Sequence, residues 1–314
     1  MRFLFLRRFW YGFLLSIVCI GAVVFYWLWQ PITPKLQWES LAGNPERGAY
    51  LARMSGCIAC HTDSKAGTMA LSGGKALKTP FGEFRAPNIT TDKVHGLGDW
   101  TPQQFATAVR EGVSPEGKPY YPAFPYTFYT QFSDQDIADL WAAFQTVPPA
   151  SIPDPEQNIS FPFNIREGLK LWRALYFKPE YFEPKPFQKS SQQSETYNRG
   201  KFIVEVAAHC AACHTPRNAL GALESENHLS GGFDSAQNKV PSITASALLE
   251  KGWTQDDLAY ALQTGITPEG DVFGGSMSDI VEQGTAFLSW QDLMAISEYL
   301  FSSDQPPLIE SNKK

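Results

Sequence analysis

Hydrophobic residues are unevenly distributed along the chain, and their densest run lies near the N-terminus. Residues 9–29 contain no charged side chain. At about 1.5 Å rise per residue, a helix of this length spans roughly the 30 Å hydrocarbon core of a bilayer. Aromatic rings, which favour the membrane interface, stand near both ends of the run: Trp10, Tyr11, Tyr26, Trp27 and Trp29. The pattern predicts a transmembrane helix.

The charges on either side of this run indicate its orientation. Three arginines precede it, whereas residues 30–37 carry only Lys35. By the positive-inside rule, the N-terminus lies in the cytoplasm and the rest of the chain on the other side of the membrane. A cleaved signal peptide is the alternative, but the run is long for one and ends in bulky aromatic residues. We therefore expect residues 1–30 to be a retained anchor, with Cys19 as a lipid-facing or packed thiol.

Beyond the anchor, apolar residues follow helical spacing and are interrupted by glycine and proline. Residues 133–144 and 289–300 each begin with Ser and carry Asp three positions later. Ser is a favourable helix N-cap, and an acid suits the positive end of the helix dipole. Because no segment calls for a sheet, the pattern predicts an all-α fold.

The chain after the anchor also contains an internal repeat. A shift of about 153 residues superimposes several short matches: Arg47-Gly48 on Arg199-Gly200, Trp100-Thr101 on Trp253-Thr254, and Gly112 on Gly265. The repeat predicts two similar domains, at residues 31–150 and 191–303. We expect a linker with a helix at residues 151–190 and a tail at residues 304–314.

Four of the five cysteines form two C-x-x-C-H motifs, one in each copy of the repeat. The motifs consist of Cys57, Cys60, His61, Cys210, Cys213 and His214. This is the signature of c-type haem attachment. Two thiols on one helical turn share a face and can form thioethers with both haem vinyl groups, while the histidine binds the iron. Zinc binding would need the two C-x-x-C pairs closer together, and a thioredoxin-like motif does not call for histidine next.

The motifs therefore predict two covalently bound haem c groups, with His61 and His214 as iron ligands. An electron-transfer haem also needs a sixth ligand, usually Met from the loop before the last helix. Met277 lies ahead of the second closing helix and is the expected ligand of the second iron. A core methionine is the alternative interpretation.

The repeat places Phe124 opposite Met277, and phenylalanine cannot ligate iron. The first haem therefore either lacks a protein sixth ligand or takes one from elsewhere. The candidates are His95, which is otherwise an exposed loop histidine, and Lys118, Tyr120, Tyr121 and Tyr126. We expect His209 and His228 to be packing or solvent residues.

Composition and charge narrow the choice of partners. The chain is 43% hydrophobic and 18% charged, which excludes a disordered protein. Outside the three N-terminal arginines, 23 basic residues face 32 acidic ones. An acidic soluble portion argues against nucleic acid and suits a partner with a basic patch, although a solvated surface explains it equally well.

Several segments resemble the multihaem cytochrome c subunits of membrane-bound periplasmic dehydrogenases that oxidise alcohols, aldehydes, sugars or sugar acids such as gluconate. The resemblance extends from about Arg47 to Leu300. It rests on RGAYLARMSGCIACHT, TPFGEFRAPNIT, GDWTPQQFATAVREG, YYPAFPY, FPFNIREGLKLWRALYF, NRGKFIVEVAAHCAACHTPRN and MSDIVEQGTAFLSWQDLMAISEYL. It implies two tandem class I cytochrome c domains in the bacterial periplasm, held by one helix in the inner membrane.

The resemblance also implies a function. Such subunits pass electrons in a respiratory chain from a dehydrogenase catalytic subunit to quinone or a terminal oxidase and are not enzymes on their own. By resemblance, Trp100 and Trp253 bond haem propionates, and the Pro87 and Pro241 carbonyls orient the iron-binding histidines. The chain departs from the family in having two motifs where well-known members have three, and Phe124 where members carry Met. An open first haem would suit a ligand-binding sensor or a peroxidase-like enzyme, which is the alternative function.

Overall fold

The computed structural model describes residues 2–34, 41–63, 66–177, 189–190 and 192–302. Helix accounts for 49% of the described residues and strand for 8%, so the mostly helical class is confirmed. The expectation of no sheet is wrong, because two small antiparallel sheets are present. The predicted tail at 304–314 lies outside the described residues, as does most of the second half of the predicted linker.

The first copy of the repeat, here called the first unit, is a set of short helices with one hairpin. Its elements are α2 (Pro45–Met54), α3 (Cys57–His61), β1 (Ala76–Thr79), β2 (Gly82–Arg85), α4 (Pro102–Glu111), α5 (Tyr126–Tyr129) and α6 (Asp134–Phe144). It is followed by β3 (Asn158–Ile159), η2 (Arg166–Gly168) and α7 (Leu169–Tyr176).

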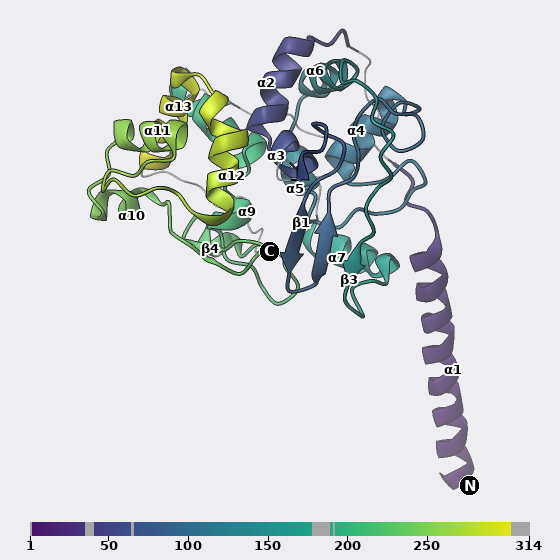
Figure 1. Ribbon diagram of the computed structural model, residues 1–314. Helices are drawn as coiled ribbons and strands as arrows, with labels where there is room; N and C mark the ends of the chain where they lie inside the picture. The colour runs from purple at the N-terminus through teal and green to yellow at the C-terminus, as the bar shows by residue number, and fades with distance from the viewer. Residues whose placement is uncertain (1, 35–40, 64–65, 178–188, 191, 303–314) are drawn as a thin grey trace.

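The second copy, the second unit, follows this order with a shorter hairpin and the additional short helices η4 and α10. Its elements are α8 (Glu195–Phe202), η3 (Ile203–Ala207), α9 (Ala211–His214), η4 (Ser225–Asn227), β4 (Gly232–Phe233), β5 (Lys239–Val240), α10 (Ala245–Glu250), α11 (Gln255–Thr264), α12 (Gly275–Gln283), η5 (Thr285–Phe287) and α13 (Trp290–Phe301). In Figure 1 the green and yellow helices of the second unit lie beside the blue and teal elements of the first unit. That the two units are separate domains stays a prediction.

Capping explains where the repeated helices begin and end. Ser133 and Ser289 accept hydrogen bonds from the backbone N–H groups of Asp136 and Asp292, so the two predicted N-caps are confirmed. Thr101 and Thr254 form capping boxes at the starts of α4 and α11. Both of these helices end at a glycine with positive φ, Gly112 at 62° and Gly265 at 79°.

The repeated Arg-Gly pair marks the closest helix crossing in each unit. A Cβ on Gly48 would lie 1.8 Å from the Asp139 carbonyl oxygen of α6, and one on Gly200 would lie 1.9 Å from the Ala295 carbonyl oxygen of α13. Glycine is needed because any side chain would push the helices apart. The adjacent arginines bind carboxylates of the facing helices: Arg47 binds Asp139, and Arg199 binds Asp292 at 2.8 Å.

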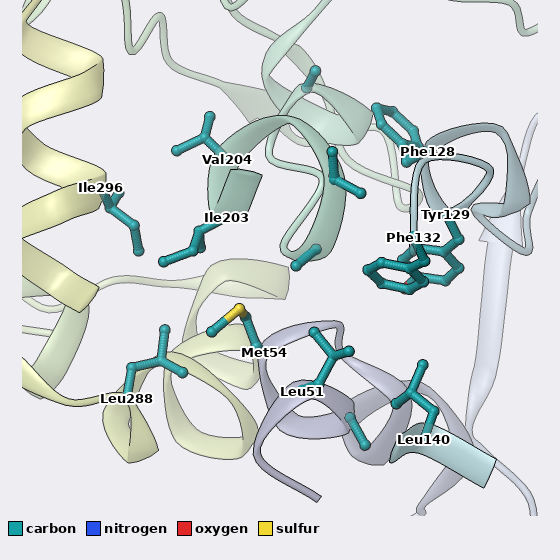
Figure 2. Close-up of a cluster of buried hydrophobic side chains, with 14 of the residues drawn as sticks. Leu51, Met54, Phe128, Tyr129, Phe132, Leu140, Ile203, Val204, Leu288 and Ile296 are labelled. Carbon is teal, nitrogen blue, oxygen red and sulfur yellow. The ribbon is translucent and has the colours of Figure 1, made fainter. Parts of the chain in front are cut away.

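One hydrophobic core runs through both units. Its members include Leu51 and Met54 of α2, Tyr129 of α5, Ile203 of η3 and Ile296 of α13. Figure 2 shows Met54 among side chains of the second unit, with the stacked rings of Tyr129 and Phe132 beside them. The core therefore fixes the position of one C-x-x-C-H turn relative to the other.

The two small sheets lie just after the C-x-x-C-H turns. In the first, β1 pairs with β2, and β2 pairs with β3 from beyond α6. In the second, β4 pairs with β5 over two residues each. Strands this short leave no alternating pattern in the sequence, which explains why helical periodicity did not reveal them.

Helix α1 (Arg2–Trp29) extends away from both units (Figure 1). Within it, Phe9–Trp29 is long and apolar enough to cross a membrane, with a mean hydropathy of 2.1 and none of it buried against the rest of the protein. A signal sequence would have the same properties.

Candidate haem-attachment sites

Each C-x-x-C-H motif lies on a short helical turn entered through a left-handed residue. Cys57 and His61 begin and end α3, and Cys210 is the N-cap residue of α9, which ends at His214. The residue before each first cysteine has positive φ, 69° at Gly56 and 40° at His209. The helical spacing places the two thiols of each motif on one face, as thioether bonds to a single haem require.

A proline carbonyl holds each histidine of the motifs. The Nδ1 atom of His61 lies 2.7 Å from the Pro87 oxygen, and that of His214 lies 2.8 Å from the Pro241 oxygen. A proton on Nδ1 leaves Nε2 as the free lone pair, which is the tautomer that binds a metal. Burial lowers the pKa of both histidines and so favours their neutral form. Both rings therefore fit the role of an iron ligand.

The four thiols of the motifs are free and favour their protonated form. Burial raises the pKa of Cys57 and of Cys210 to about 12 and also raises the pKa of Cys60 and Cys213. Reactive or metal-binding thiols have a lowered pKa instead. The described cysteines form no disulfide. This environment is unsuited to a redox dithiol or a thiolate metal site, whereas a thioether carries no charge and is compatible with burial.

A cavity of about 2560 Å³ opens at these turns. It is larger than the 300–1,000 Å³ typical of small-ligand pockets, so it suits a bulky group. Residues of both units line it, among them Cys57, Cys60, His61, Trp100 and Cys213. The residues of the first motif thus fit haem, because both thiols and the oriented His61 lie at the cavity wall, whereas of the second motif only Cys213 lines this cavity.

The two repeated tryptophans precede the capping threonines of α4 and α11 and pack against the core. Trp100 lines the cavity. Trp253 hydrogen-bonds the exposed carboxylate of Glu269 and thereby lowers its pKa, after larger effects from the backbone and Thr267. Trp253 therefore presents a donor to a carboxylate; its role toward a propionate stays a prediction, as does that of Trp100.

Met277 lies on helix α12, and not in a loop as the position of family ligands had led us to expect. It is partly buried and packs on the core, as do Cys210 and Trp253. Its repeat partner Phe124 also packs on the core and lines the cavity. Ring contacts at 5.9 to 6.4 Å surround Phe124 with Tyr120, Tyr126 and Tyr129. Phe124 itself thus offers no ligand atom, whereas two of the tyrosines around it, Tyr120 and Tyr126, are candidate ligands by sequence.

The other candidate ligands of the first unit all lie in one region, although not all of them face the cavity freely. His95 lines the cavity and is half-buried. It lies near Asp154, whose pKa is raised because burial outweighs the opposing effects of the Asn88 N–H and His95. The Tyr121 hydroxyl donates to the Phe163 carbonyl at 2.8 Å. Tyr126 is fully buried, whereas Lys118 is exposed. None of these candidates stands at position 124, which is the position that the repeat pairs with Met277.

The two motifs lie close to each other. The ring of His209, next to Cys210, contacts Phe128 and Tyr129 of the first unit at centroid distances of 5.6 and 5.5 Å. A Cβ on Gly56 would lie 4.0 Å from the His209 ring. His209 is therefore a packing residue at the junction of the two turns, and burial lowers its pKa to about 4.

Sequence reasoning missed a buried polar cluster behind the second motif. Glu205 of η3 accepts hydrogen bonds from the Tyr299 hydroxyl at 2.7 Å and from His228 Nε2 at 2.8 Å. All three side chains are buried, and η3 is a π-helical turn. The signal in the sequence was an acid inside the apolar run IVEVAA, since a lone charge there needs a buried partner.

Two C-x-x-C-H turns with oriented histidines, in a mostly helical chain, define the class of the protein as a c-type cytochrome. A scan against protein-family models finds no match. A protein named diheme cytochrome c-type from Cereibacter sphaeroides is 37% identical over 292 residues, which cover 91% of this chain and 95% of that protein. The chain therefore belongs to the dihaem c-type cytochrome family.

Longer relatives connect this family with dehydrogenases. The fructose dehydrogenase cytochrome subunit of Gluconobacter japonicus is 37% identical over 258 residues, or 82% of this chain and 52% of that protein. The gluconate 2-dehydrogenase cytochrome c subunit of Pantoea cypripedii is 37% identical over 270 residues, or 82% of this chain and 59% of that protein. The chain thus spans little more than half the length of these two relatives. The resemblance to the cytochrome c subunits of dehydrogenases, expected from the sequence motifs, is confirmed.

Proposed function

We propose that this chain is a membrane-anchored dihaem cytochrome that carries electrons from the catalytic subunit of a periplasmic dehydrogenase to quinone or a terminal oxidase. The observation that carries the proposal is the pair of C-x-x-C-H turns, each with its histidine held by a proline carbonyl. Cys57, Cys60, Cys210 and Cys213 attach the two haems, and His61 and His214 bind the irons. Met277 is the sixth ligand of the second iron. The subunit names of the relatives support a dehydrogenase as donor.

The chain itself contributes position and environment. The haem irons supply one-electron chemistry when bound. The Pro87 and Pro241 carbonyls fix the ring orientation of His61 and His214 and keep Nε2 free to bind. The shared core keeps the two turns side by side, which is what electron exchange between them needs. Sulfur from Met277 favours a relatively high potential at the second site.

The anchor belongs to the same proposal. Helix Phe9–Trp29 crosses the inner membrane with the arginine-bearing N-terminus in the cytoplasm and both units in the periplasm. This arrangement confines electron transfer to the membrane surface, where a quinone or an oxidase would accept the electrons.

Mass spectrometry of the full chain, matured in a host that attaches haem c, tests the haem assignment. We expect two covalent haems per chain, one in a Cys57→Ala/Cys60→Ala variant and one in a Cys210→Ala/Cys213→Ala variant. N-terminal sequencing and carbonate extraction of membranes test the anchor: the intact N-terminus and a membrane-bound chain are expected. Electron transfer is tested by co-purification of a dehydrogenase and by reduction of the haems when its substrate is added. A chain that lacks either haem contradicts the dihaem assignment.

A second candidate function arises from the aromatic cluster around Phe124, which leaves the first site without a Met counterpart. If the first iron is open, the chain binds small ligands there as a sensor or a peroxidase-like enzyme. Carbon monoxide added to the dithionite-reduced protein distinguishes the cases: one adduct per two haems in the wild type and two in Met277→Ala indicate an open first site. No adduct in the wild type rules out an open site, and His95→Ala then asks whether His95 is the replacement ligand.

A further inference from the structure

The β4–β5 hairpin of the second unit is fixed to the turn that bears His214. Gly231, just before β4, donates its N–H to the His214 carbonyl at 2.8 Å. Pro241, just after β5, holds the ring of His214 through its carbonyl. A Cβ on Gly232 would lie 2.6 Å from the Cys213 carbonyl oxygen, so β4 packs closely on the motif, beside α9 in Figure 1. Both strands of the hairpin therefore contact the C-x-x-C-H turn.

The same hairpin also holds helix α12, which bears Met277. The hydroxyl of Ser276, the residue before Met277, donates to Asp234 Oδ2 at 3.0 Å. Asp234 follows β4 directly and is only 5% exposed. Its carboxylate also accepts hydrogen bonds from the Asn238 N–H at 2.8 Å and from the Asn238 side-chain amide at 3.0 Å. A buried carboxylate of the hairpin thus binds the first turn of α12.

The surroundings of Asp234 keep this carboxylate ionised. Burial raises its pKa, but hydrogen bonds from Asn238 and Ser276 outweigh burial and hold the pKa of Asp234 below its ordinary value. Hydrogen bonds to a charged acceptor are stronger than those between neutral groups. Helix α12 starts after Gly274, which has no side chain to cap it. The bond from Ser276 to Asp234 is therefore a strong contact at a helix start that lacks its own cap.

A second contact reaches α12 from the first unit. Asp279 forms an ion pair with Lys75, but the two side chains are 33% and 44% exposed, so this pair contributes little. Helical spacing places Ser276 and Asp279 on one side of α12 and Met277 on another. Met277 packs on the core. The polar side of α12 is thus bound to its neighbours while Met277 lies on a different side.

The first unit lacks a counterpart of this carboxylate. The Gly-Gly pair near the start of each hairpin aligns Ala76 with Asp234. Alanine has no side-chain acceptor. The carboxylate and the methionine therefore occur together in the second unit, and neither residue type stands at the matched positions, 76 and 124, of the first.

We propose that Asp234 is a positioning residue for the sixth ligand of the second iron. The hairpin is bound to the turn of His214 through Gly231 and Pro241, and to the turn of Met277 through Asp234. It therefore fixes the position of one ligand relative to the other. A ligand held in place in this way binds more tightly, because less conformational freedom is lost when its sulfur binds. The inference rests on the proposed function, in which Met277 ligates the second iron.

Displacement of the methionine by imidazole tests this role in the full dihaem protein in detergent. In the oxidised state, an iron–thioether bond gives a weak charge-transfer band at the red end of the visible spectrum. The band disappears when imidazole replaces the sulfur. Loss of the band in Met277→Ala establishes that it reports on Met277.

Ser276→Ala should lower the imidazole concentration for half-displacement about tenfold, as expected for the loss of a hydrogen bond to a charged group. Ser276→Thr keeps the hydroxyl and should restore the wild-type value. Ser278→Ala is the matched control, because the Ser278 hydroxyl bonds to the Gly275 carbonyl within α12 at 2.9 Å. It should leave the value unchanged. Adding Ser276→Ala to Asp234→Ala should cause no further drop, since both remove the same bond.

A wild-type value in Ser276→Ala overturns the role of Asp234. An equal drop in Ser278→Ala and Ser276→Ala also overturns it, because any change in the first turns of α12 would then loosen the ligand. In both cases the band is still lost in Met277→Ala, so the proposed ligand stands. Absence of the band from the wild type, or its persistence in Met277→Ala, instead contradicts Met277 as the ligand, and with it the inference.

Discussion

The first unit holds His61 against the Pro87 carbonyl, and the second holds His214 against the Pro241 carbonyl, with Nδ1–O distances of 2.7 and 2.8 Å. Each unit also uses an Arg-Gly pair at its closest helix crossing, with the glycine lying against a backbone carbonyl. The parts that orient the C-x-x-C-H turn are therefore the same in both units.

The surroundings of the turn differ between the units. Where the second unit has Met277, the first has Phe124 within a group of tyrosines. Behind the second turn lies the buried cluster of Glu205, His228 and Tyr299. The shift that aligns the first cysteines places Ala52 at the position of Glu205. The first unit also binds the segment that follows α1, where Ile32 N–H donates to the Gly117 carbonyl.

This comparison separates two tasks. Attaching a haem and orienting its histidine depend on the shared helix crossings and proline carbonyls. The residue ahead of the closing helix, Met277 or Phe124, and the buried carboxylate of Glu205 belong to the parts that differ. One frame can thus support two redox sites with different properties, and substitutions that exchange the differing residues should exchange the properties.

The largest effect is expected from Phe124→Met, which gives the first unit the residue type of the second. If the wild-type first haem binds carbon monoxide, a thioether at this position supplies the sixth ligand and that adduct should be lost. Phe124→Leu is the control, since it removes the ring without adding sulfur, and should leave carbon monoxide binding unchanged. The measurement is the visible spectrum of the reduced protein under carbon monoxide. An unaltered adduct in Phe124→Met would mean that position 124 does not face the iron.

The next largest effect concerns the shared frame. Gly48→Ala and Gly200→Ala should each lower the free energy of unfolding by about 3 kcal/mol or more, because the new Cβ meets a backbone carbonyl that cannot rotate away. Gly168→Ala is the control: φ is −59° there and no atom lies within 4 Å of the added Cβ. Urea unfolding of the full chain in detergent measures all three. Similar values for Gly168→Ala and Gly200→Ala would contradict the tight crossing.

A smaller loss is expected from Glu205→Ala, which breaks the buried cluster found only in the second unit. It leaves the Tyr299 hydroxyl and His228 Nε2 without their acceptor, at a cost of about 2 to 3 kcal/mol. Glu226→Ala removes an exposed carboxylate from the neighbouring loop and should change stability by no more than about 0.5 kcal/mol. Equal losses in the two variants, measured by urea unfolding, would show that the cluster contributes nothing.

The repeated local signals of this chain could be predicted from sequence. Ser133 and Ser289 cap the helices they were expected to cap, because an N-cap is defined by residues three positions apart. The same holds for the C-x-x-C-H turns, whose spacing dictates one helical face. These features need no knowledge of the tertiary fold.

Contacts between distant segments could not be predicted in this way. His228 and Glu205 lie 23 positions apart, and Lys170 reaches Gln30 from 140 positions away. Met277 lies on α12, the helix that precedes α13. The spacing of apolar residues does not reveal this short helix. The strand pair β4 and β5 has two residues on each side, too few to show a period.

The smallest effect concerns pH and the arginine–aspartate pair of the second unit. Burial alone would raise the pKa of Asp292, but hydrogen bonds from Arg199 and Tyr50, with the charge of Arg199, hold it below the ordinary value. A lowered folded-state pKa stabilises the protein above the unfolded value of about 4, and this stability is lost as pH falls through the folded pKa. Asp292→Asn should therefore cost about 1 kcal/mol at neutral pH, because the Arg199 side chain is 41% exposed and screened. The unfolding free energy of Asp292→Asn should fall less steeply in acid than that of the wild type or of the control Asp256→Asn. Urea titrations from pH 7 to pH 3 measure this dependence. The same dependence of unfolding free energy on pH in Asp292→Asn and the wild type would contradict the lowered pKa of Asp292.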